Sequence, residues 1–353
     1  MNASPLSPAP LADPGPPPSP HRPGVLLVMD DLLDPTDVFD EQARDRIHRL
    51  ARWDSPVLAY TAAQLPPRAL AEAEVLLTCW GAPVLDGPFL DRAPRLRAVI
   101  HAAGSVKGIV TRATWQRGIA VSSAAWANAL PVAEYTLAAV LSVNKQVLQI
   151  REHYRRTRST AGLRQDWRHI GNYRRTIGIV GASHIGRRVI ELLRSFDYQI
   201  LLHDPTLDPA AAEALGTRLV PLDELCRLSD VVSLHAPALA ETRGMINEQR
   251  LALMRDGATL INTAWGSLVE TEALLDELRT GRIDAVLDVV EPLPTADSVL
   301  FDLPNVLLTP HIAGSQGTEI HRMGALALDE LERYANDTPF THTVHPEHLA
   351  RAA

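Results

Sequence analysis

The first chemical signal in the sequence is a glycine-containing segment between an apolar run and a helical pattern. Residues 176–186 read Thr-Ile-Gly-Ile-Val-Gly-Ala-Ser-His-Ile-Gly. Gly181 is placed to make a tight turn, and Gly186 allows a helix to pack closely on a strand. Ser183 stands where a dinucleotide fingerprint usually has a third glycine. The amides at the start of the helix attract phosphate, and the hydroxyl of Ser183 offers one more hydrogen bond.

An acidic residue follows the next apolar run at the distance that a dinucleotide site requires. Asp204 comes directly after the run 199–203, twenty-three residues after Gly181. Such a carboxylate accepts hydrogen bonds from the ribose hydroxyls of adenosine and repels a 2′-phosphate. No Lys or Arg follows closely, so the sequence predicts NAD rather than NADP. The alternative is a strand–turn–helix unit that binds no phosphate. It is disfavoured because the strand, the glycines, the helix and the acid all stand in register.

The elements that must position these residues alternate along the chain from Gly24 onward. Short apolar runs of strand length alternate with segments of helical spacing, such as 37–53, which predicts parallel sheets with helices on both faces. A long helix, expected over 131–150, separates two such series. The predicted fold class is therefore α/β, with two doubly wound parallel-sheet domains. Strands are expected at 25–29, 56–60, 75–79, 96–101 and 118–122, and then at 176–180, 199–203, 231–235, 259–262, 285–289 and 306–308.

The same pattern suggests domain boundaries. A proline-rich tail is expected over residues 1–23, which hold nine of the 27 prolines and cannot supply a core. It lacks the basic start and apolar run of a signal peptide, and its other interpretation is a ligand for a proline-recognising domain. Residues 24–127 and 313–345 are expected to form one domain, because the last helix, 318–336, should pack back on the first series. Residues 128–312 form the other domain.

Composition excludes several classes of protein. Charged residues make up 22% of the chain and the net charge is −8, which argues against general nucleic-acid binding and against an anionic membrane surface. The longest apolar stretch, 135–143, is far shorter than the ~20 residues of a membrane span. Cys79 and Cys226 are too few for a disulfide framework and suit a reducing compartment. We therefore expect a soluble, cytoplasmic protein.

Motifs between Leu96 and Gly314 resemble the D-isomer-specific 2-hydroxyacid dehydrogenases. They follow the family's order and spacing: NALPVAE from 128, GASHIG from 181, DVVSLHAP from 230, ETRGMI from 241, INTAWG from 261, LDV from 287 and TPHIAG from 309. The resemblance implies a Rossmann NAD domain inserted in a flavodoxin-like substrate domain. It also implies a homodimer formed through the NAD domain and the arm 151–175. Eight arginines in this arm can indicate nucleic acid, but a partner-subunit contact is favoured in an acidic chain.

NAD is the cofactor that the resemblance implies. The expected cofactor-binding residues are Gly181, Ser183, His184, Ile185, Asp204, His235, Ala236, Pro237, Thr242, Thr263, Ala264, Asp288, His311 and Gly314. The thirteen histidines suggest a metal at first, but none has a metal-ligand spacing with supporting residues. We therefore expect no metal site.

The catalytic residues follow the family only in part. In this family a histidine exchanges the proton, and an arginine grips the substrate's carboxylate and C2 oxygen. His311 is the histidine's counterpart and suits general acid–base catalysis, although it could also merely cap a strand end. Trp265 occupies the arginine's position in Asn-Thr-Ala-Trp-Gly. Because an indole cannot supply a bidentate charged grip, Trp265 argues against ordinary turnover of small 2-oxo acids.

The glutamate that supports the family's histidine is displaced. It should lie five residues after the aspartate of the LDV motif, where this chain has Leu293. Glu291 comes into register if two residues are deleted before it, and it would then support His311. The alternative, which the sequence leaves open, is that Glu291 is a solvated loop acid and His311 lacks its partner.

The expected substrate loop also departs from the family, whose G-x-G-x-D reads Ala-Gly-Ser-Val-Lys at 103–107. The amides of Gly104 and Ser105 are expected to face the substrate's oxygens. Lys107 is either a replacement cation or, as we favour here, a solvated lysine. Two tryptophans on neighbouring loops either line the same cleft, which would suit a bulkier or less charged ligand, or belong to the core: Trp80 and Trp126.

Two functions therefore stand open. The first is an NAD-dependent oxidoreductase with an altered small-molecule substrate, supported by Asp204, Asp288 and His311. The second is a catalytically weakened NAD-binding protein that acts as a partner, sensor or oligomer subunit, supported by Trp265 and the displaced Glu291. We favour the enzyme, because a chain released from catalysis would not be expected to keep His311 in its motif.

Overall fold

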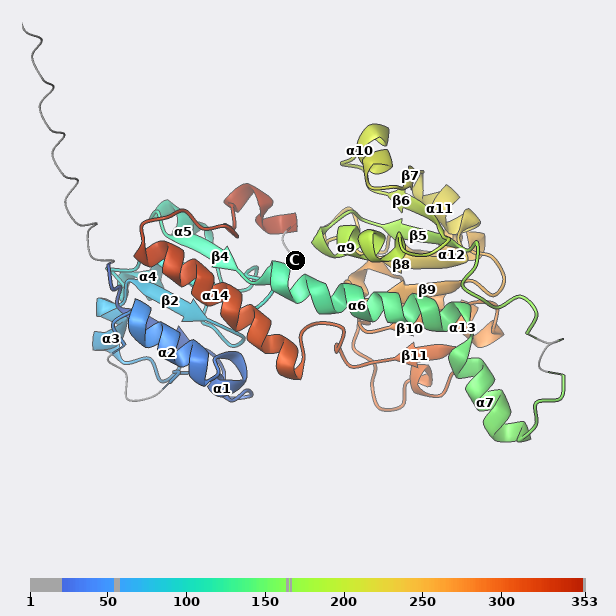
Figure 1. Ribbon diagram of the computed structural model, residues 1–353, viewed down its shortest axis with the longest axis horizontal. Coiled ribbons are helices and arrows are strands. Elements are labelled where there is room, and N and C mark those ends of the chain that lie inside the picture. The colour runs from blue at the N-terminus through green and yellow to red at the C-terminus, as the bar shows by residue number, and fades with distance from the viewer. Residues whose placement is uncertain (1–20, 54–57, 163–164, 166, 352–353) are drawn as a thin grey trace, which may run out of the picture.

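The computed structural model describes residues 21–53, 58–162, 165 and 167–351, which form two lobes joined by a long helix (Figure 1). The first lobe contains a four-stranded sheet in the order β1-β2-β3-β4, and the second a seven-stranded sheet in the order β11-β10-β9-β8-β5-β6-β7. All neighbouring strands in both sheets pair in parallel. The predicted fold class is confirmed.

The first lobe combines segments from both ends of the described chain. Its strands are β1 (Val25–Val28), β2 (Val75–Thr78), β3 (Ala98–His101) and β4 (Ala120–Ser123). Its helices are α1 (Pro35–Val38), α2 (Glu41–Leu50), α3 (Pro67–Glu72), α4 (Gly87–Asp91), α5 (Arg112–Gln116), η3 (Gly317–Glu319), α14 (Ile320–Ala335) and η4 (Pro346–Arg351). Most strand residues are buried apolar side chains, because helices and loops cover both faces of the sheet, although β4 ends in Ser122 and Ser123.

The second lobe is built from one continuous stretch of chain. Its strands are β5 (Thr176–Val180), β6 (Gln199–His203), β7 (Arg218–Leu219), β8 (Val231–Leu234), β9 (Thr259–Asn262), β10 (Asp284–Leu287) and β11 (Val306–Leu308). Its helices are α9 (His184–Leu193), α10 (Pro209–Ala214), α11 (Leu222–Leu228), α12 (Glu248–Leu253), η1 (Gly266–Leu268), α13 (Thr271–Thr280) and η2 (Val299–Phe301). Among the strands of this lobe, β7 alone was not predicted, because a strand of two residues is too short to give a periodic signal.

The last long helix packs on the first lobe, as the sequence predicts. Figure 1 shows α14 lying beside α2. Its Gly324 approaches α1 so closely that a Cβ there would lie 2.1 Å from the carbonyl oxygen of Val38. The chain beyond α14 then pairs with β4, where the Val344 amide donates to the carbonyl of Val121 at 2.8 Å. The domain boundaries given above stay a prediction.

The helix between the lobes differs from the expected 131–150. It starts earlier, as α6 (Ala125–Asn144), with Pro131 inside it, and a second helix, α7 (Val147–Thr157), follows. The helix ends where Gln146 takes a left-handed backbone with a φ of 46°, and the carbonyl oxygen of Asn144 that this leaves free accepts a hydrogen bond from the Gly171 amide at 2.7 Å. Helix α6 spans both lobes in Figure 1 and packs against α9.

The N-terminal part of the fold also differs from the predictions. Where the sequence predicts one helix over 37–53, the structure has two, α1 and α2, and Asp34 and Asp40 each cap one of them by accepting a hydrogen bond from a first-turn amide. Residues 21–23, expected in the tail, contact the fold, since the Arg22 guanidinium donates to the carbonyl of Ala51 at 2.9 Å. The rest of the tail and part of the expected strand 56–60 lie outside the described residues. Among the helices that are described, none has the length and apolarity to cross a membrane.

Candidate functional site

The residues singled out for cofactor binding gather at one edge of the second lobe. Loop 181–183 follows β5, Asp204 follows β6, 235–237 follow β8, 263–265 follow β9 and Asp288 follows β10. In parallel α/β sheets the carboxyl ends of the strands form a common edge, where ligands bind. The remaining members of the set lie on loops that start from the same edge: Thr242, His311 and Gly314.

The turn between β5 and α9 requires glycine at two positions. Gly181 has a φ of 96°, and a Cβ there would lie 2.7 Å from the amide nitrogen of Ala236. A Cβ at Gly186 would lie 2.0 Å from the carbonyl oxygen of Gly181. The turn therefore packs directly on the segment after β8, as the sequence predicts for its two glycines.

The start of α9 leaves backbone donors available for an anion. Ser183 caps the helix, and its hydroxyl accepts a hydrogen bond from the Gly186 amide at 3.3 Å. Within the described chain, the amides of His184 and Ile185 have no acceptor. Free amides at a helix N-terminus are the arrangement that binds phosphate, so this turn fits the pyrophosphate of a dinucleotide.

A buried histidine lies beneath this turn. His235 follows β8, and its Nε2 lies 2.9 Å from the Oγ of Ser233. Burial lowers the pKa of His235 to about 3, so the ring is neutral at physiological pH. Its Nδ1 is buried and has no hydrogen-bond partner in the part of the chain that the structure describes. This unpaired polar atom next to the turn is a second sign that the edge is built for a polar ligand.

Asp204 is tied to the same turn. Its Oδ2 accepts from the Ala182 amide at 2.7 Å, and its Oδ1 accepts from the amide and hydroxyl of Thr206 at 2.8 and 2.6 Å. Burial raises the pKa of Asp204, but the hydrogen bonds from Thr206 and Ala182 outweigh it, so the pKa lies below its ordinary value. The carboxylate therefore stays ionised, which favours ribose hydroxyls over a 2′-phosphate.

Two of the expected cofactor-binding threonines have engaged hydroxyl groups. The Thr242 hydroxyl donates to the carbonyl of Pro237 at 2.6 Å and accepts from the Leu239 amide at 2.9 Å. The Thr263 hydroxyl lies 3.1 Å from that of Thr136 on α6. These contacts shape the loops after β8 and β9 and attach the second loop to the helix between the lobes.

Asp288 holds the segment that carries His311. Its Oδ1 accepts from the Thr309 hydroxyl at 2.6 Å and the Ile312 amide at 2.8 Å, and its Oδ2 accepts from the Ala313 amide at 2.9 Å. His311 itself has a φ of 58°, and its amide donates to the backbone carbonyl of Asp288 at 3.0 Å. The buried carboxylate thus fixes the backbone while the imidazole stays exposed.

The expected hydrogen bond between Glu291 and His311 is not formed. Glu291 Oε1 instead pairs with Nη1 of Arg243 at 2.9 Å, and half of the Glu291 side chain is exposed. The backbone of Glu291 packs directly against Gly266, where an added Cβ would lie 2.5 Å from the Glu291 amide nitrogen. Among the described residues, the His311 side chain has no hydrogen-bond partner. The ion pair with Arg243 gave no sequence signal, since the two residues are far apart in the chain.

The loops that carry the substrate and proton-transfer candidates meet at Asn128, in the first turns of α6. Its Oδ1 accepts from the Ser315 amide at 2.9 Å. A Cβ at Gly104 would lie 3.2 Å from Asn128 Nδ2, and one at Gly314 would lie 3.3 Å from Asn128 Oδ1. The loop 103–107 of the first lobe and the segment after β11 therefore pack on the same amide group. This brings Gly104, Ser105 and His311 to one junction between the lobes.

Trp265 and Lys107 meet across this junction. Trp265 is partly buried, packs against the core of the second lobe and receives a hydrogen bond on its carbonyl from Asn262 Nδ2 at 2.9 Å. The Lys107 Nζ lies 5.5 Å from the centroid of the Trp265 ring. Burial lowers the pKa of Lys107. Lys107 is thus partly buried against Trp265, which differs from the solvated lysine that the sequence favoured.

The two tryptophans that the sequence placed either in the cleft or in the core are not core residues. Trp80, on the loop after β2, is 38% exposed, and Trp126, in the first turn of α6, is 46% exposed. The Trp126 ring meets the His184 ring edge-on, with 5.2 Å between their centroids. Trp126 thus links the helix between the lobes to the start of α9.

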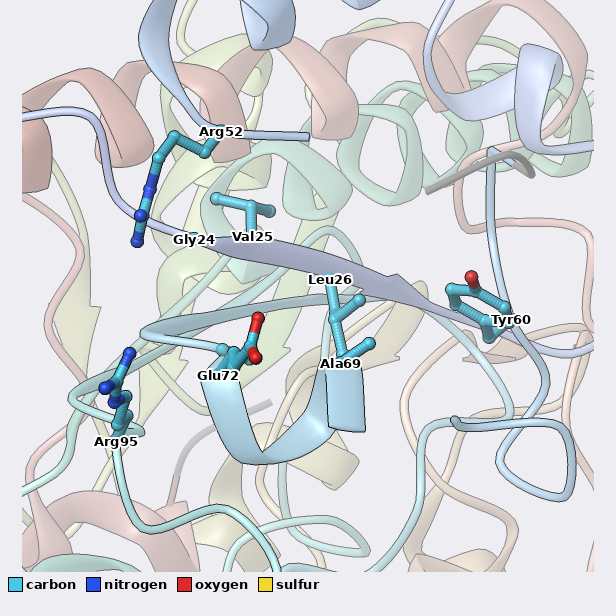
Figure 2. Close-up of a pocket in the computed structure, with 9 residues that line it drawn as sticks. Gly24, Val25, Leu26, Arg52, Tyr60, Ala69, Glu72 and Arg95 are labelled. Carbon is cyan, nitrogen blue, oxygen red and sulfur yellow. The ribbon is translucent and has the colours of Figure 1, made fainter. Parts of the chain in front are cut away.

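Two further features lie apart from this site. Figure 2 shows a pocket at the amino end of β1 in the first lobe, lined by residues that include Gly24, Val25, Arg52, Tyr60, Glu72 and Arg95. Because ligands of parallel sheets bind at the carboxyl ends of the strands, this pocket is not the candidate site. In the described parts of the chain, no group of three or more His, Cys, Asp or Glu is placed to hold a metal ion.

The second lobe has the features of a dinucleotide-binding Rossmann domain: its strand order, its glycine turn and the acid after β6. Comparison with known proteins gives the family. Residues 137–313 match the family described as D-isomer specific 2-hydroxyacid dehydrogenase, NAD binding domain. The chain belongs to the D-isomer-specific 2-hydroxyacid dehydrogenase family, whose members are NAD-dependent oxidoreductases.

Individual relatives carry several activities. The D-3-phosphoglycerate dehydrogenase of Mycobacterium tuberculosis is 33% identical over 261 residues, which cover 72% of this chain and 48% of the relative. The glyoxylate reductase of Thermococcus kodakarensis is 34% identical over 265 residues, covering 71% and 77%. The structure of D-lactate dehydrogenase from Aquifex aeolicus with NAD and lactic acid aligns with a TM-score of 0.67 and 27% identity, covering 89% of this chain and 96% of that one. The chain spans about half the length of the phosphoglycerate dehydrogenases that it matches.

Proposed function

We propose that this protein transfers a hydride between NAD(H) and the C2 carbon of a 2-oxo or 2-hydroxy acid, or of a bulkier, less charged relative of such an acid. The observation that carries the proposal is the rigid segment 309–313. Asp288 holds this segment so that His311 stands exposed at the edge where the dinucleotide turn lies. The names glyoxylate reductase and D-lactate dehydrogenase among the relatives support the substrate class.

The residues of the chain divide the work as follows. NADH, when bound, supplies the hydride. In the direction of reduction His311 donates a proton to the C2 oxygen, and in the direction of oxidation it accepts that proton. The free amides at the start of α9 would hold the cofactor's phosphates, and Asp204 would hold the adenosine ribose. The amides of Gly104 and Ser105 face the substrate's oxygens.

The test of this function is the variant His311→Asn. Asparagine tolerates the left-handed backbone of this position better than most residues, so the segment should keep its shape. We expect kcat to fall by about 10²- to 10⁴-fold, while the affinity for NADH is unchanged. His48→Asn, at an exposed histidine of α2 in the first lobe, is the matched control.

A catalytically weakened NAD-binding protein is the second candidate. Trp265 in place of the family's arginine favours it, and so does the pairing of Glu291 with Arg243 rather than with His311. This candidate leads if the protein binds NADH, turns over no 2-oxo acid or bulkier relative, and responds to His311→Asn no more than to the control variant.

We also propose a homodimer formed through the second lobe and the arm 151–175. Helix α7 projects from the second lobe in Figure 1 and has no buried residues. A groove lined mainly by apolar side chains runs between α6, α7 and the last two strands, and the exposed Val147 and Tyr154 lie on α7. A second copy would cover this surface. Light scattering should give twice the chain mass for the whole protein, and a monomer when 147–170 is replaced by a short linker.

A cytoplasmic location fits the two cysteines. Cys79 and Cys226 are both free and buried. Burial raises the pKa of Cys79 to about 12 and that of Cys226 to about 11, so neither thiol is reactive near neutral pH. We propose a reducing compartment, which fractionation of the source cells would test.

A further inference from the structure

The contact between Lys107 and Trp265 joins the two lobes at the edge where their functional loops lie. Lys107 ends the loop 103–107 after β3, and Trp265 follows β9. The Lys107 Nζ is 5.5 Å from the centroid of the indole ring, within the range of a cation–π contact. A positive charge from the other lobe therefore lies beside Trp265, the residue that stands in place of the family's arginine.

The Lys107 ammonium lacks a negative partner. No carboxylate in the described chain forms an ion pair with it, although most of the ion pairs there join an arginine to an acid. Its side chain is also partly buried, and burial lowers its pKa. A partly buried ammonium without a counter-ion is unfavourable alone and gains most from an anion that enters the site.

The loops that carry Lys107 and His311 lie together, as binding of a substrate with an acid group next to its carbonyl requires. The loop that carries Lys107 and the segment that carries His311 pack on the same side chain, Asn128. A 2-oxo acid has its carboxylate on the carbon next to C2. A substrate whose C2 oxygen faces His311 would thus direct its carboxylate toward this junction.

We propose that Lys107 is the substrate-binding cation of this protein, which holds the carboxylate of a 2-oxo acid while the indole of Trp265 positions the ammonium. This inference rests on the proposed function and specifies its substrate as an anionic 2-oxo acid. A lysine is a single point charge, whereas an arginine can bind a carboxylate and a C2 oxygen together. Lys107 therefore sets binding more than rate, and the C2 oxygen depends on His311.

The test uses oxamate, which has the carboxylate and neighbouring carbonyl of a 2-oxo acid but is not reduced. Its binding to the full-length protein with saturating NADH is measured by calorimetry. Lys107→Met keeps the length of the side chain without its charge and should weaken oxamate binding about 10- to 100-fold. Lys107→Arg should restore most of the affinity. Lys145 is the only other lysine in the chain, so Lys145→Met is the matched control and should bind as the wild type does.

The outcomes separate this inference from the proposed function. Equal oxamate affinity in the wild type and in Lys107→Met, with NADH affinity intact in both, overturns the role of Lys107. Failure of the wild type with NADH to bind oxamate overturns it as well. Lysine-dependent oxamate binding without reduction of any 2-oxo acid would support Lys107 as the carboxylate-binding cation and contradict the proposed hydride transfer.

Discussion

The cofactor side and the substrate side of the junction differ in how closely they keep the family's pattern. On the cofactor side, Gly181, Gly186 and Asp204 stand in the expected places and make the expected backbone contacts. On the substrate side, Trp265 replaces an arginine, and Lys107 replaces an acidic residue. The departures from the family's pattern are therefore confined to the loops on the substrate side.

The reason for the difference lies in what each side uses for recognition. The cofactor turn works through backbone shape, and a side chain at Gly181 or Gly186 would collide with main-chain atoms. The substrate side works through charges at the tips of loops. A cation can be supplied there from either lobe without disturbing the packing of the sheets, so substitutions on this side change the ligand rather than the fold.

The largest effect is expected from Gly181→Ala on the cofactor side. Strain from the left-handed backbone costs about 1–2 kcal/mol, and overpacking against Ala236 adds about 1–3 kcal/mol. We expect a lower melting temperature and loss of NADH binding in a fluorescence titration. Gly118→Ala has a similar φ, 69°, but open space around the new methyl group, so it measures the strain alone. Equal effects of the two variants would contradict the tight packing of the turn.

Asp288→Asn should have the next largest effect, at the border of the two sides. An amide has one acceptor oxygen, and its NH₂ group would face the backbone donors of Ile312 or Ala313. We expect kcat to fall about 10- to 100-fold because His311 is no longer held in place. Asp302→Asn, at an exposed position, is the control. Unchanged kcat in Asp288→Asn would mean that the carboxylate does not position His311.

Trp265→Arg restores the family's residue on the substrate side. A guanidinium there can stabilise the charge that develops on the C2 oxygen, so kcat/KM for simple 2-oxo acids such as glyoxylate or pyruvate should rise about 10- to 100-fold. Trp265→Phe keeps an aromatic face for Lys107 and should give no gain. If Trp265→Arg gives no gain in a protein that still binds NADH, then more than this one catalytic element has been lost.

Asp204→Ala should change cofactor preference by a smaller factor. The wild type should bind NADH more tightly than NADPH, because an ionised carboxylate repels the 2′-phosphate. Removing the carboxylate should reduce the ratio of the NADH affinity to the NADPH affinity about tenfold, mainly by weakening NADH binding. Fluorescence titration with both cofactors measures this. Comparable affinities of the wild type for the two would contradict the role of Asp204.

The smallest expected effect is a change of substrate affinity with pH. Burial lowers the pKa of Lys107, so its ammonium is present below that pKa and is lost as the pH rises through it. Oxamate binding should therefore weaken before the pH reaches the ordinary lysine value of about 10.4. Lys107 is the one lysine left in the Lys145→Arg variant, so reductive ¹³C-methylation of this variant gives a single lysine signal for NMR titration. A Lys107 signal that titrates at the ordinary value would contradict this prediction.

Much of the fold could be predicted from the sequence, because its signals are local. The runs 176–180, 199–203, 259–262 and 306–308 match the observed strands, since buried parallel strands need unbroken apolar residues. The break after Asn144 could not be predicted, because neither glycine nor proline marks it and the left-handed residue is Gln146.

The site was predictable only where backbone geometry defines it. The glycine turn and Asp204 follow from spacing along a strand and a helix. The pairing of Glu291 with Arg243 and the contact of Lys107 with Trp265 join residues on separate loops. Contacts between separate loops depend on how the lobes and loops are arranged, which the periodicity of the sequence does not encode.

The central claim is hydride transfer from NADH to C2 of an anionic 2-oxo acid. Its most direct test is incubation of the protein with NADH that carries deuterium at the transferable position of C4, together with a series of 2-oxo acids, followed by mass spectrometry of the products. We predict a 2-hydroxy acid with one deuterium at C2, and much less of it with His311→Asn. NADH binding without any deuterium-labelled 2-hydroxy acid across the series would contradict the claim.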